Sequence, residues 1–208
     1  MRIIDGGMTA WCVEKYPLQT SANIATPERE FGAPVPLRPE IIYDRAQVKE
    51  IINKSDANLV SIRTWEEYIG KTSGYSYIRK KGCIPGSTWG HGGTGTYRIE
   101  HFRNPDNTFR SYKEIESIWE EWGISRRQNN CYFCGTGWRA SEAFFAAMLM
   151  AWPSISVYDG GWLEWSTFEC SDEDCTPYTK SECRHELTRG NKFTCEEKQN
   201  QVKVAAEI

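Results

Sequence analysis

The sequence of 208 residues contains no apolar run long enough for a membrane-spanning helix, which argues against an integral membrane protein. Residues 1–7 lack the hydrophobic region of a secretory signal peptide, and we therefore expect a cytoplasmic protein. Lysine and arginine form no block, and the formal net charge of −3 provides no positive field for nucleic acid. We expect neither a membrane nor nucleic acid among the partners of this protein.

Paired cysteines of the kind that mark strong zinc sites are absent from the end of the chain, although cysteine itself is plentiful there. That region contains Cys170, Cys175, Cys183, Cys195 and His185. Because their spacing lacks such pairs, we predict no metal site and expect these cysteines to form disulfides or to remain reduced thiols. We expect residues 169–208 to form an acidic, weakly ordered tail. The other cysteines are scattered through apparently folded sequence, which favours reduced thiols in a reducing compartment.

Short apolar runs alternate with helical patterns between residues 39 and 168. Strands are predicted at 59–63, after the turn at 84–86, at 130–134 and at 155–159, and helices at 45–52, 64–68, 111–123 and 140–151. This alternation predicts an α/β fold with a mostly parallel central sheet covered by helices on both faces. Residues 18–38 are rich in proline and predict an extended linker.

One short motif occurs twice, far apart in the chain. Residues 3–11 and 157–165 share Asp, Gly, Gly and Trp at equivalent positions, and each copy predicts a short strand, a Gly-Gly turn and a helix start. A repeat at this separation favours two domains of one type over a solenoid. Because the first copy begins at residue 3, we expect residues 1–17 to be the remnant of the end of a first domain. Residues 39–168 then form the complete, catalytic domain.

The segment Cys134–Arg139, with the sequence Cys-Gly-Thr-Gly-Trp-Arg, follows an apolar strand and precedes a helix. Glycine at positions 135 and 137 allows the backbone to curl around the cysteine sulfur. Converging N–H groups, the helix N-terminus and the guanidinium of Arg139 then favour thiolate over thiol. In an open parallel sheet, ligands bind beyond the carboxyl ends of the strands, where Cys134 is expected. We predict that Cys134 is a catalytic nucleophile.

A cysteine held by backbone amides suits two chemistries, the hydrolysis of phosphate esters and the transfer of sulfur. In phosphatase loops the arginine stands one position further from the cysteine than Arg139 stands from Cys134, so this loop is smaller and better suited to a persulfide. No carboxylic acid lies within the loop or beside it to protonate an alkoxide leaving group. We therefore favour sulfur transfer, in which an activated thiol needs no metal or organic cofactor.

A C-x-x-C pattern joins Cys131 to Cys134 in the sequence. On an extended strand their Cα atoms lie roughly 10 Å apart. Disulfides need about 4.4–6.8 Å between Cα atoms. We therefore predict that Cys131 is a buried strand residue and not a redox partner.

Four segments resemble the rhodanese family of sulfurtransferases. Residues 59–68 are similar to the first strand and helix of the family, 82–87 to its Gly-His-Ile-Pro-Gly-Ala segment, 134–139 to its active loop and 159–162 to its closing turn. The resemblance implies a rhodanese-like three-layer α/β sandwich and sulfurtransferase activity. Two positions depart from the family pattern, since Ser61 replaces the usual Asp and Cys83 the usual His. The anchoring that those two residues supply must come from elsewhere in this chain.

The resemblance is closer to tandem-domain sulfurtransferases of the thiosulfate/mercaptopyruvate type and to those that form ergothioneine anaerobically, through residues 74–78, 89–91, 101–104 and the loop. It implies that Cys134 carries a persulfide, that Thr136 donates to the substrate or the sulfur, and that Tyr75 is a proton donor or acceptor. The implied sulfur donor is thiosulfate, polysulfide or mercaptopyruvate, and the implied acceptor is a nucleophile such as an imidazole. A missing N-terminal rhodanese domain is a further implied partner.

The remaining candidates are predicted to contact substrate. Gly135 and Gly137 bring the backbone close, and Trp138 offers a flat face to an aromatic or quaternary-ammonium acceptor, with plain packing as the alternative. His91 lies in a glycine-rich loop where it contacts substrate or is simply solvated. Two other functions remain open: a non-catalytic rhodanese-fold interaction module and, more remotely, a cysteine-dependent phosphatase.

Overall fold

The computed structural model describes residues 3–27, 30 and 32–170 of the chain. In this part of the chain, five strands form one parallel sheet in the order β1-β5-β4-β2-β3. The strands are β1 (Ile42–Tyr43), β2 (Ala57–Ser61), β3 (Ser87–Trp89), β4 (Asn129–Phe133) and β5 (Ile155–Tyr158). The predicted parallel sheet is confirmed. The short edge strand β1 was not predicted from the sequence.

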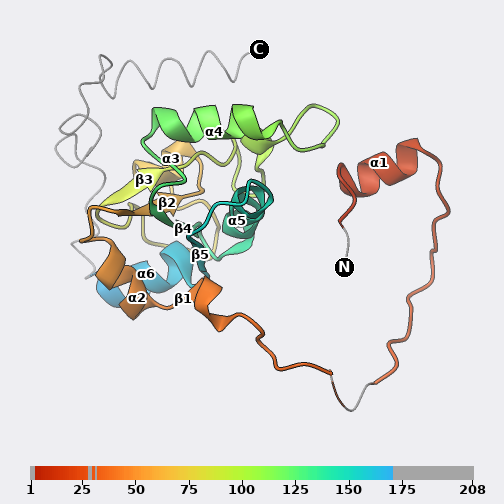
Figure 1. The fold of residues 1–208 in the computed structure, drawn as a ribbon, viewed down its shortest axis with the longest axis horizontal. Coiled ribbons are helices and arrows are strands. Elements are labelled where there is room, and N and C mark those ends of the chain that lie inside the picture. Colours follow the sequence, from red (N-terminus) through yellow and green to blue (C-terminus); the bar gives the residue numbers. More distant parts are fainter. Residues whose placement is uncertain (1–2, 28–29, 31, 171–208) are drawn as a thin grey trace.

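Helices cover both faces of the sheet and complete three layers (Figure 1). One face carries α3 (Trp65–Tyr68), α4 (Tyr112–Glu121) and α5 (Trp138–Leu149), and the other carries α2 (Arg45–Ile51) and α6 (Gly161–Glu169). Side chains alternate along β4, so that Tyr132 packs with the first group of helices and Phe133 with the second. The three-layer α/β sandwich expected from the sequence is confirmed.

Three helices begin at capping boxes, in which a side chain before the helix and one in its first turn satisfy each other's backbone N–H groups. The pairs are Asp44 with Gln47, Thr64 with Glu67, and Ser111 with Glu114. These pairs fix the starts of α2, α3 and α4 close to the predicted positions. The predicted strand 59–63 instead ends at Ser61, and the two residues after it enter the candidate site.

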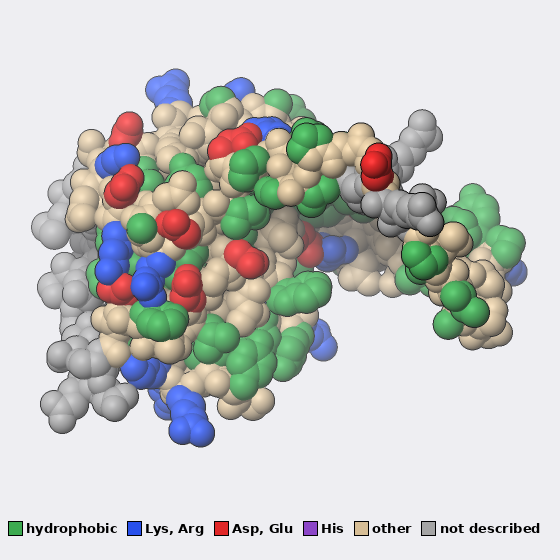
Figure 2. Space-filling view, turned by 90° about the horizontal axis from the view of Figure 1, so that it is seen from below, with side chains coloured by type: hydrophobic (Ala, Val, Ile, Leu, Met, Phe, Trp, Pro, Cys, Tyr) green, Lys and Arg blue, Asp and Glu red, His purple; other side chains and the backbone are tan. Residues whose placement is uncertain are grey.

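The N-terminal part of the described chain contains a short helix α1 (Gly7–Val13) and then an extended segment that reaches the 3₁₀ turn η1 (Pro39–Ile41). No strand forms at residues 3 and 4, contrary to expectation. Helix α1 lies beside the loop between η2 (Glu100–Phe102) and α4 (Figure 1), where Asp5 Oδ1 accepts a hydrogen bond from Phe109 N at 2.9 Å. Figure 2 shows this part standing out from the domain with apolar side chains on its surface. Among the described residues, no helix combines the length and apolar character needed to cross a membrane.

Candidate active site

The loop 134–139 connects β4 to α5 at the carboxyl edge of the sheet. Cys134 follows the last residue of β4 and is fully buried, while Gly137 adopts φ 83° and directly precedes α5. A φ in this range is accessible mainly to glycine, so Gly137 makes the turn from strand to helix possible. Gly135 brings the backbone against Tyr75, because a Cβ there would lie 2.4 Å from the Tyr75 ring. The positive φ of Gly137 and the close approach of Gly135 to Tyr75 thus explain why the loop needs glycine at both positions.

The closing Asp-Gly-Gly turn shapes the loop from the other side. Trp162 N donates to Cys134 O at 2.8 Å, and Leu163 N donates to Gly135 O at 3.0 Å. Gly161 makes this approach possible, since a Cβ on it would lie 2.6 Å from Cys134 O. The first two carbonyls of the loop are therefore satisfied by the first turn of α6. Within the described residues, the backbone N–H groups of 135–139 have no protein acceptor.

Arg139 does not stand alone in the site, because its guanidinium is paired with Glu67. Nη1 and Nη2 of Arg139 donate to Glu67 Oε2 and Oε1 at 2.7 and 2.8 Å, and both side chains are buried. Burial opposes ionisation of Glu67, but the hydrogen bonds from Arg139 outweigh it and hold the pKa of Glu67 below its ordinary value. Burial likewise opposes the charge on Arg139, and Glu67 outweighs it and raises the pKa of Arg139. Both groups are therefore charged at neutral pH.

This pair corrects one argument made from the sequence. The absence of a carboxylic acid near the loop holds only along the chain, because folding places Glu67 against Arg139 and Asp159 Oδ1 close to Gly137. Both oxygens of Glu67 accept hydrogen bonds from Arg139, so this carboxylate is not available to protonate a leaving group. The sequence signal for Glu67 was its place in the Thr64 capping box, which does not reveal the second role.

A cavity of about 380 Å³ opens over the loop. It is lined by Tyr75, Tyr77, Tyr97, Ile99, Thr136, Trp138, Arg139 and Glu142. Tyr75 and Tyr77 stack with ring centroids 5.2 Å apart, and the Tyr97 ring meets Tyr75 edge-on at 5.1 Å. Trp138 is 81% exposed at the rim, which leaves its ring available for contact. Burial raises the pKa of Tyr75 even though the nearby Arg139 charge acts to lower it, so Tyr75 is a protonated phenol at neutral pH.

The structure thus brings together most of the residues predicted for the site. Tyr75, Thr136, Trp138 and Arg139 line one cavity, and Gly135 and Gly137 form the backbone beneath it. His91 lies elsewhere, with its ring stacked on Trp89 at 3.9 Å and edge-on to His101 at 5.3 Å. Trp89 is fully buried and so presents no face to a substrate.

The other cysteines are arranged differently from Cys134. Cys131 and Cys134 face opposite sides of the sheet, and neither forms a disulfide. Burial raises the pKa of Cys131 to about 12, which makes this thiol unreactive. Cys170 takes part in a disulfide, and the other tail cysteines lie outside the described residues. No group of ligating side chains suited to a metal ion occurs in the described part of the chain.

Sequence reasoning missed a second buried guanidinium. Arg63 follows β2 and is fully buried. Its Nε donates to Ser61 Oγ at 3.1 Å and its Nη2 to Gly82 O at 3.0 Å, so the position that usually carries Asp in the family supplies only a hydroxyl here. The signal was an arginine directly after an apolar strand, at the same sheet edge as Cys134.

Comparison with known proteins agrees with this geometry. Residues 44–168 match the rhodanese-like domain family. The thiosulfate sulfurtransferase YnjE of Escherichia coli is 45% identical over 169 residues, which cover 80% of this chain and 39% of that protein. The anaerobic ergothioneine biosynthesis enzyme of Chlorobium limicola, solved with its natural substrate trimethyl histidine, superposes with a TM-score of 0.78. It is 45% identical, over 81% of this chain and 40% of that one.

A third relative is a substituted form of EanB, solved as a cysteine persulfide in a tetrahedral intermediate state with ergothioneine. It has the same TM-score of 0.78 and 45% identity, over 81% of this chain and 40% of that one. The chain spans about two fifths of the length of these relatives. The family match covers more than half of the sequence and contains the loop and its closing turn, so the chain belongs to the rhodanese-like domain family.

Proposed function

We propose that this chain is a sulfurtransferase that moves a sulfane sulfur through a persulfide on Cys134. The observation that carries the proposal is the arrangement of the loop, whose first two carbonyls bond to α6 while its N–H groups find no acceptor in the described protein. Such N–H groups at a helix start stabilise an anion placed among them. A cysteine thiolate and the outer sulfur of its persulfide are both anions of suitable size.

In the first half-reaction, the Cys134 thiolate attacks the sulfane sulfur of the donor. With thiosulfate, the donor S–S bond breaks, a new S–S bond forms to Cys134, and sulfite leaves with the bonding electron pair. Polysulfide reacts in the same way and loses a shorter polysulfide. With mercaptopyruvate the C–S bond breaks, and the carbon takes up a proton.

In the second half-reaction, a nucleophilic acceptor enters the cavity over the loop. Tyr75 gives its proton to the outer sulfur, the acceptor attacks that sulfur, and the electron pair of the S–S bond returns to Cys134 as a thiolate. The proton that the acceptor loses restores the Tyr75 phenol. The aromatic walls of the cavity favour an acceptor that is aromatic and cationic, such as an imidazole that carries a quaternary ammonium group.

The proposal is tested by mass spectrometry after incubation with thiosulfate or polysulfide. We expect a gain of one sulfur atom that is absent in Cys134→Ser and retained in Cys131→Ser, the matched variant on the opposite face of the sheet. An equal gain in Cys134→Ser refutes the assignment. Formation of thiocyanate from cyanide separates catalysis from a pure interaction module, which forms none, and turnover of a phosphate ester would favour a phosphatase instead.

We also propose that residues 1–17 are the end of a preceding rhodanese-like domain. In the repeat, Met8 and Trp11 correspond to Trp162 and Trp165 of α6. The two tryptophans of α6 are 0% and 5% exposed, whereas α1 buries no residue and Met8 is 63% exposed. Helix α1 therefore carries large apolar residues at the positions that are buried in α6, but the described structure contains no domain that covers them.

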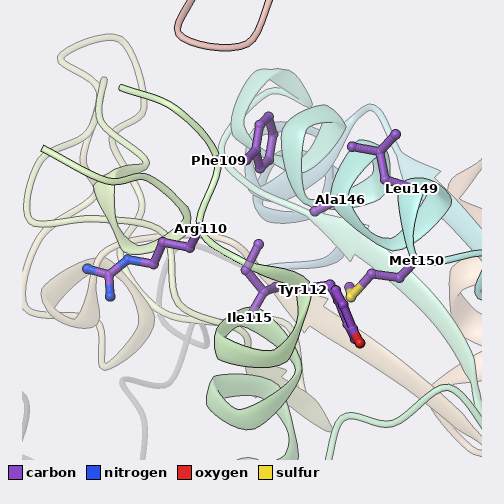
Figure 3. Close-up of a pocket in the computed structure, with 7 residues that line it drawn as sticks. All are labelled: Phe109, Arg110, Tyr112, Ile115, Ala146, Leu149 and Met150. Carbon is purple, nitrogen blue, oxygen red and sulfur yellow. The ribbon is translucent and has the colours of Figure 1, made fainter. Parts of the chain in front are cut away.

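An apolar pocket of about 420 Å³ lies next to α1 and supports the same proposal. Figure 3 shows Phe109, Tyr112, Ile115, Leu149 and Met150 gathered between the start of α4 and the end of α5. Phe109, which lines the pocket, also donates its backbone N–H to Asp5, so the segment that leads into α1 contacts the edge of this pocket. Mapping of the transcript tests the proposal: an upstream reading frame in phase with residue 1 that encodes a rhodanese-like domain supports it, and an in-frame stop codon directly upstream refutes it.

A further inference from the structure

The cavity over the cysteine loop has walls that come from separate segments of the chain. Tyr97 and Ile99 form one wall, directly before the 3₁₀ turn η2. Trp138 and Glu142 belong to another wall and lie one helical turn apart on α5. The width of the cavity therefore depends on how the segment 97–99 is held relative to α5.

Arg103 connects these two walls. It follows η2 directly, and its backbone N–H donates to Glu100 O at 3.1 Å, so its main chain is fixed to the end of the first wall. Its side-chain Nε donates to Glu142 Oε1 on α5 at 2.7 Å, which is a charge-assisted hydrogen bond. The side chains of Arg103 and Glu142 are 28% and 20% exposed, so water only partly screens the pair.

Further contacts hold the guanidinium of Arg103 in this orientation. Its Nη1 donates to Asn107 O at 2.9 Å, and its carbon lies 5.4 Å from the centre of the Phe109 ring. The Phe109 ring in turn lies 5.9 Å from the ring of Phe145, which is on α5. The turn formed by residues 103–109 is thus attached to α5 by an ion pair and by an aromatic contact.

We propose that Arg103 is a positioning residue that sets the width of the acceptor cavity through its ion pair with Glu142. The inference deepens the proposed function and rests on it, because the sulfur acceptor would enter this cavity. Arg103 acts through Glu142 and does not itself line the described cavity. Since Arg103 neutralises the carboxylate of Glu142, the selection among acceptors depends on the shape and the aromatic surface of the cavity.

Removal of the ion pair has a defined consequence for the cavity. Arg103→Met deletes the guanidinium but keeps a long apolar side chain beside Phe109. The segment 97–99 and α5 are then no longer joined by a charged contact, and the cavity widens. A large molecule gains access to Cys134 relative to a small one, while an acceptor that fills the cavity is held less tightly.

The test compares how fast a small and a large reagent alkylate Cys134, on the full chain without any sulfur donor. The reagents are iodoacetamide and N-phenylmaleimide, and peptide mapping by mass spectrometry distinguishes Cys134 from the other cysteines. We expect Arg103→Met to raise the rate with N-phenylmaleimide relative to that with iodoacetamide by about fivefold, the size expected for loss of a partly exposed ion pair. The matched control is Arg45→Met, because Arg45 pairs with Glu169 at 3.0 Å with 33% and 20% exposure, between α2 and α6 on the other face of the sheet.

A double-variant cycle shows whether Arg103 and Glu142 act as one pair. Glu142→Gln should change the ratio of the two rates in the same direction, and Arg103→Met/Glu142→Gln should change it no more than the larger single effect. The inference is overturned if Arg103→Met leaves the ratio unchanged, if Arg45→Met changes it equally, or if the two effects at the cavity add in full.

A kinetic measurement separates positioning from a general structural role. With trimethyl histidine as the sulfur acceptor, Arg103→Met should raise KM about fivefold more than with cyanide, which is too small to contact both walls, and kcat should change less than KM. An equal rise for both acceptors contradicts the inference. Failure of the proposed function would appear as no sulfur gain in mass with the alkylation ratio still altered. Failure of this inference would leave the sulfur gain intact and the ratio constant.

Discussion

The ion pair between Glu67 and Arg139 yields the sharpest quantitative prediction. Both side chains are buried, two hydrogen bonds of 2.7 and 2.8 Å join them, and Glu67 Oε2 also accepts from Thr64 N at 2.9 Å. Glu67→Gln removes the negative charge and leaves the Arg139 guanidinium buried without a counter-ion. Breaking a buried pair in this way costs about 3–5 kcal/mol. A domain has a total stability of about 5–15 kcal/mol, so the variant loses a large part of it.

The assay is urea unfolding followed by tryptophan fluorescence. For a slope of about 2 kcal/mol per molar urea, the expected loss lowers the midpoint by about 2 M. The matched control is Glu114→Gln, because Glu114 has the same capping role on α4 but its side chain is 52% exposed. That substitution should cost about 1 kcal/mol or less. A loss in Glu67→Gln no greater than in Glu114→Gln would refute the reasoning.

The pH dependence of this difference provides a second check. The pKa of Glu67 in the folded chain lies below its unfolded value of about 4.3. The pair therefore stabilises the fold fully above that unfolded value, and the stabilisation is lost as the pH falls through the folded pKa. The gap in stability between the unsubstituted protein and Glu67→Gln should be full at neutral pH and shrink in strong acid. A gap that is constant with pH would contradict an ionised Glu67.

Three further substitutions test the loop and its cavity. Gly161→Ala should cost at least about 2 kcal/mol in urea unfolding, because φ is 55° and the new Cβ lies 2.6 Å from Cys134 O. Gly7→Ala, at φ 54° with open space around it, should cost only about 1–2 kcal/mol, and equal costs would contradict the close approach. Gly135→Ala should slow persulfide formation by about 100-fold, since its Cβ would lie 2.4 Å from the Tyr75 ring. In the double variant Gly135→Ala/Tyr75→Ala, part of the lost sulfur loading should return. An unchanged rate in Gly135→Ala alone would exclude this contact. Trp138→Ala should change stability by no more than about 0.5 kcal/mol because the side chain is 81% exposed, and an unchanged KM for an aromatic cation would show that Trp138 does not bind the acceptor.

Much of the fold could be predicted because its signals are local. Apolar runs and capping pairs such as Thr64 with Glu67 determine where strands and helices start, and the cysteine loop with its two glycines marks the carboxyl edge of the sheet. The predicted sheet, helices and layers are accordingly confirmed. The end of β2 differs because Ser61 is the last residue that pairs with β4, and the chain bends at Arg63.

The partners of the loop could not be predicted because they are set by contacts between distant segments. Glu67 and Arg139 are 72 residues apart in the chain, and nothing in either local pattern indicates that their side chains meet. The aromatic cavity has the same origin, since Tyr75, Tyr97 and Trp138 come from three separate segments. His91, predicted to contact substrate or to be solvated, stacks on Trp89, and its local sequence does not indicate this contact.

The two hydrogen bonds from the start of α6 to the cysteine loop also bear on how the protein is made. During synthesis, residues 134–139 leave the ribosome well before Trp162 and Leu163, whose N–H groups hold the loop carbonyls in place. The segment that carries Cys134 is therefore synthesised before the residues that hold its loop in place. Under the proposed function, Cys134 would acquire its full activating surroundings only after α6 has packed against the loop.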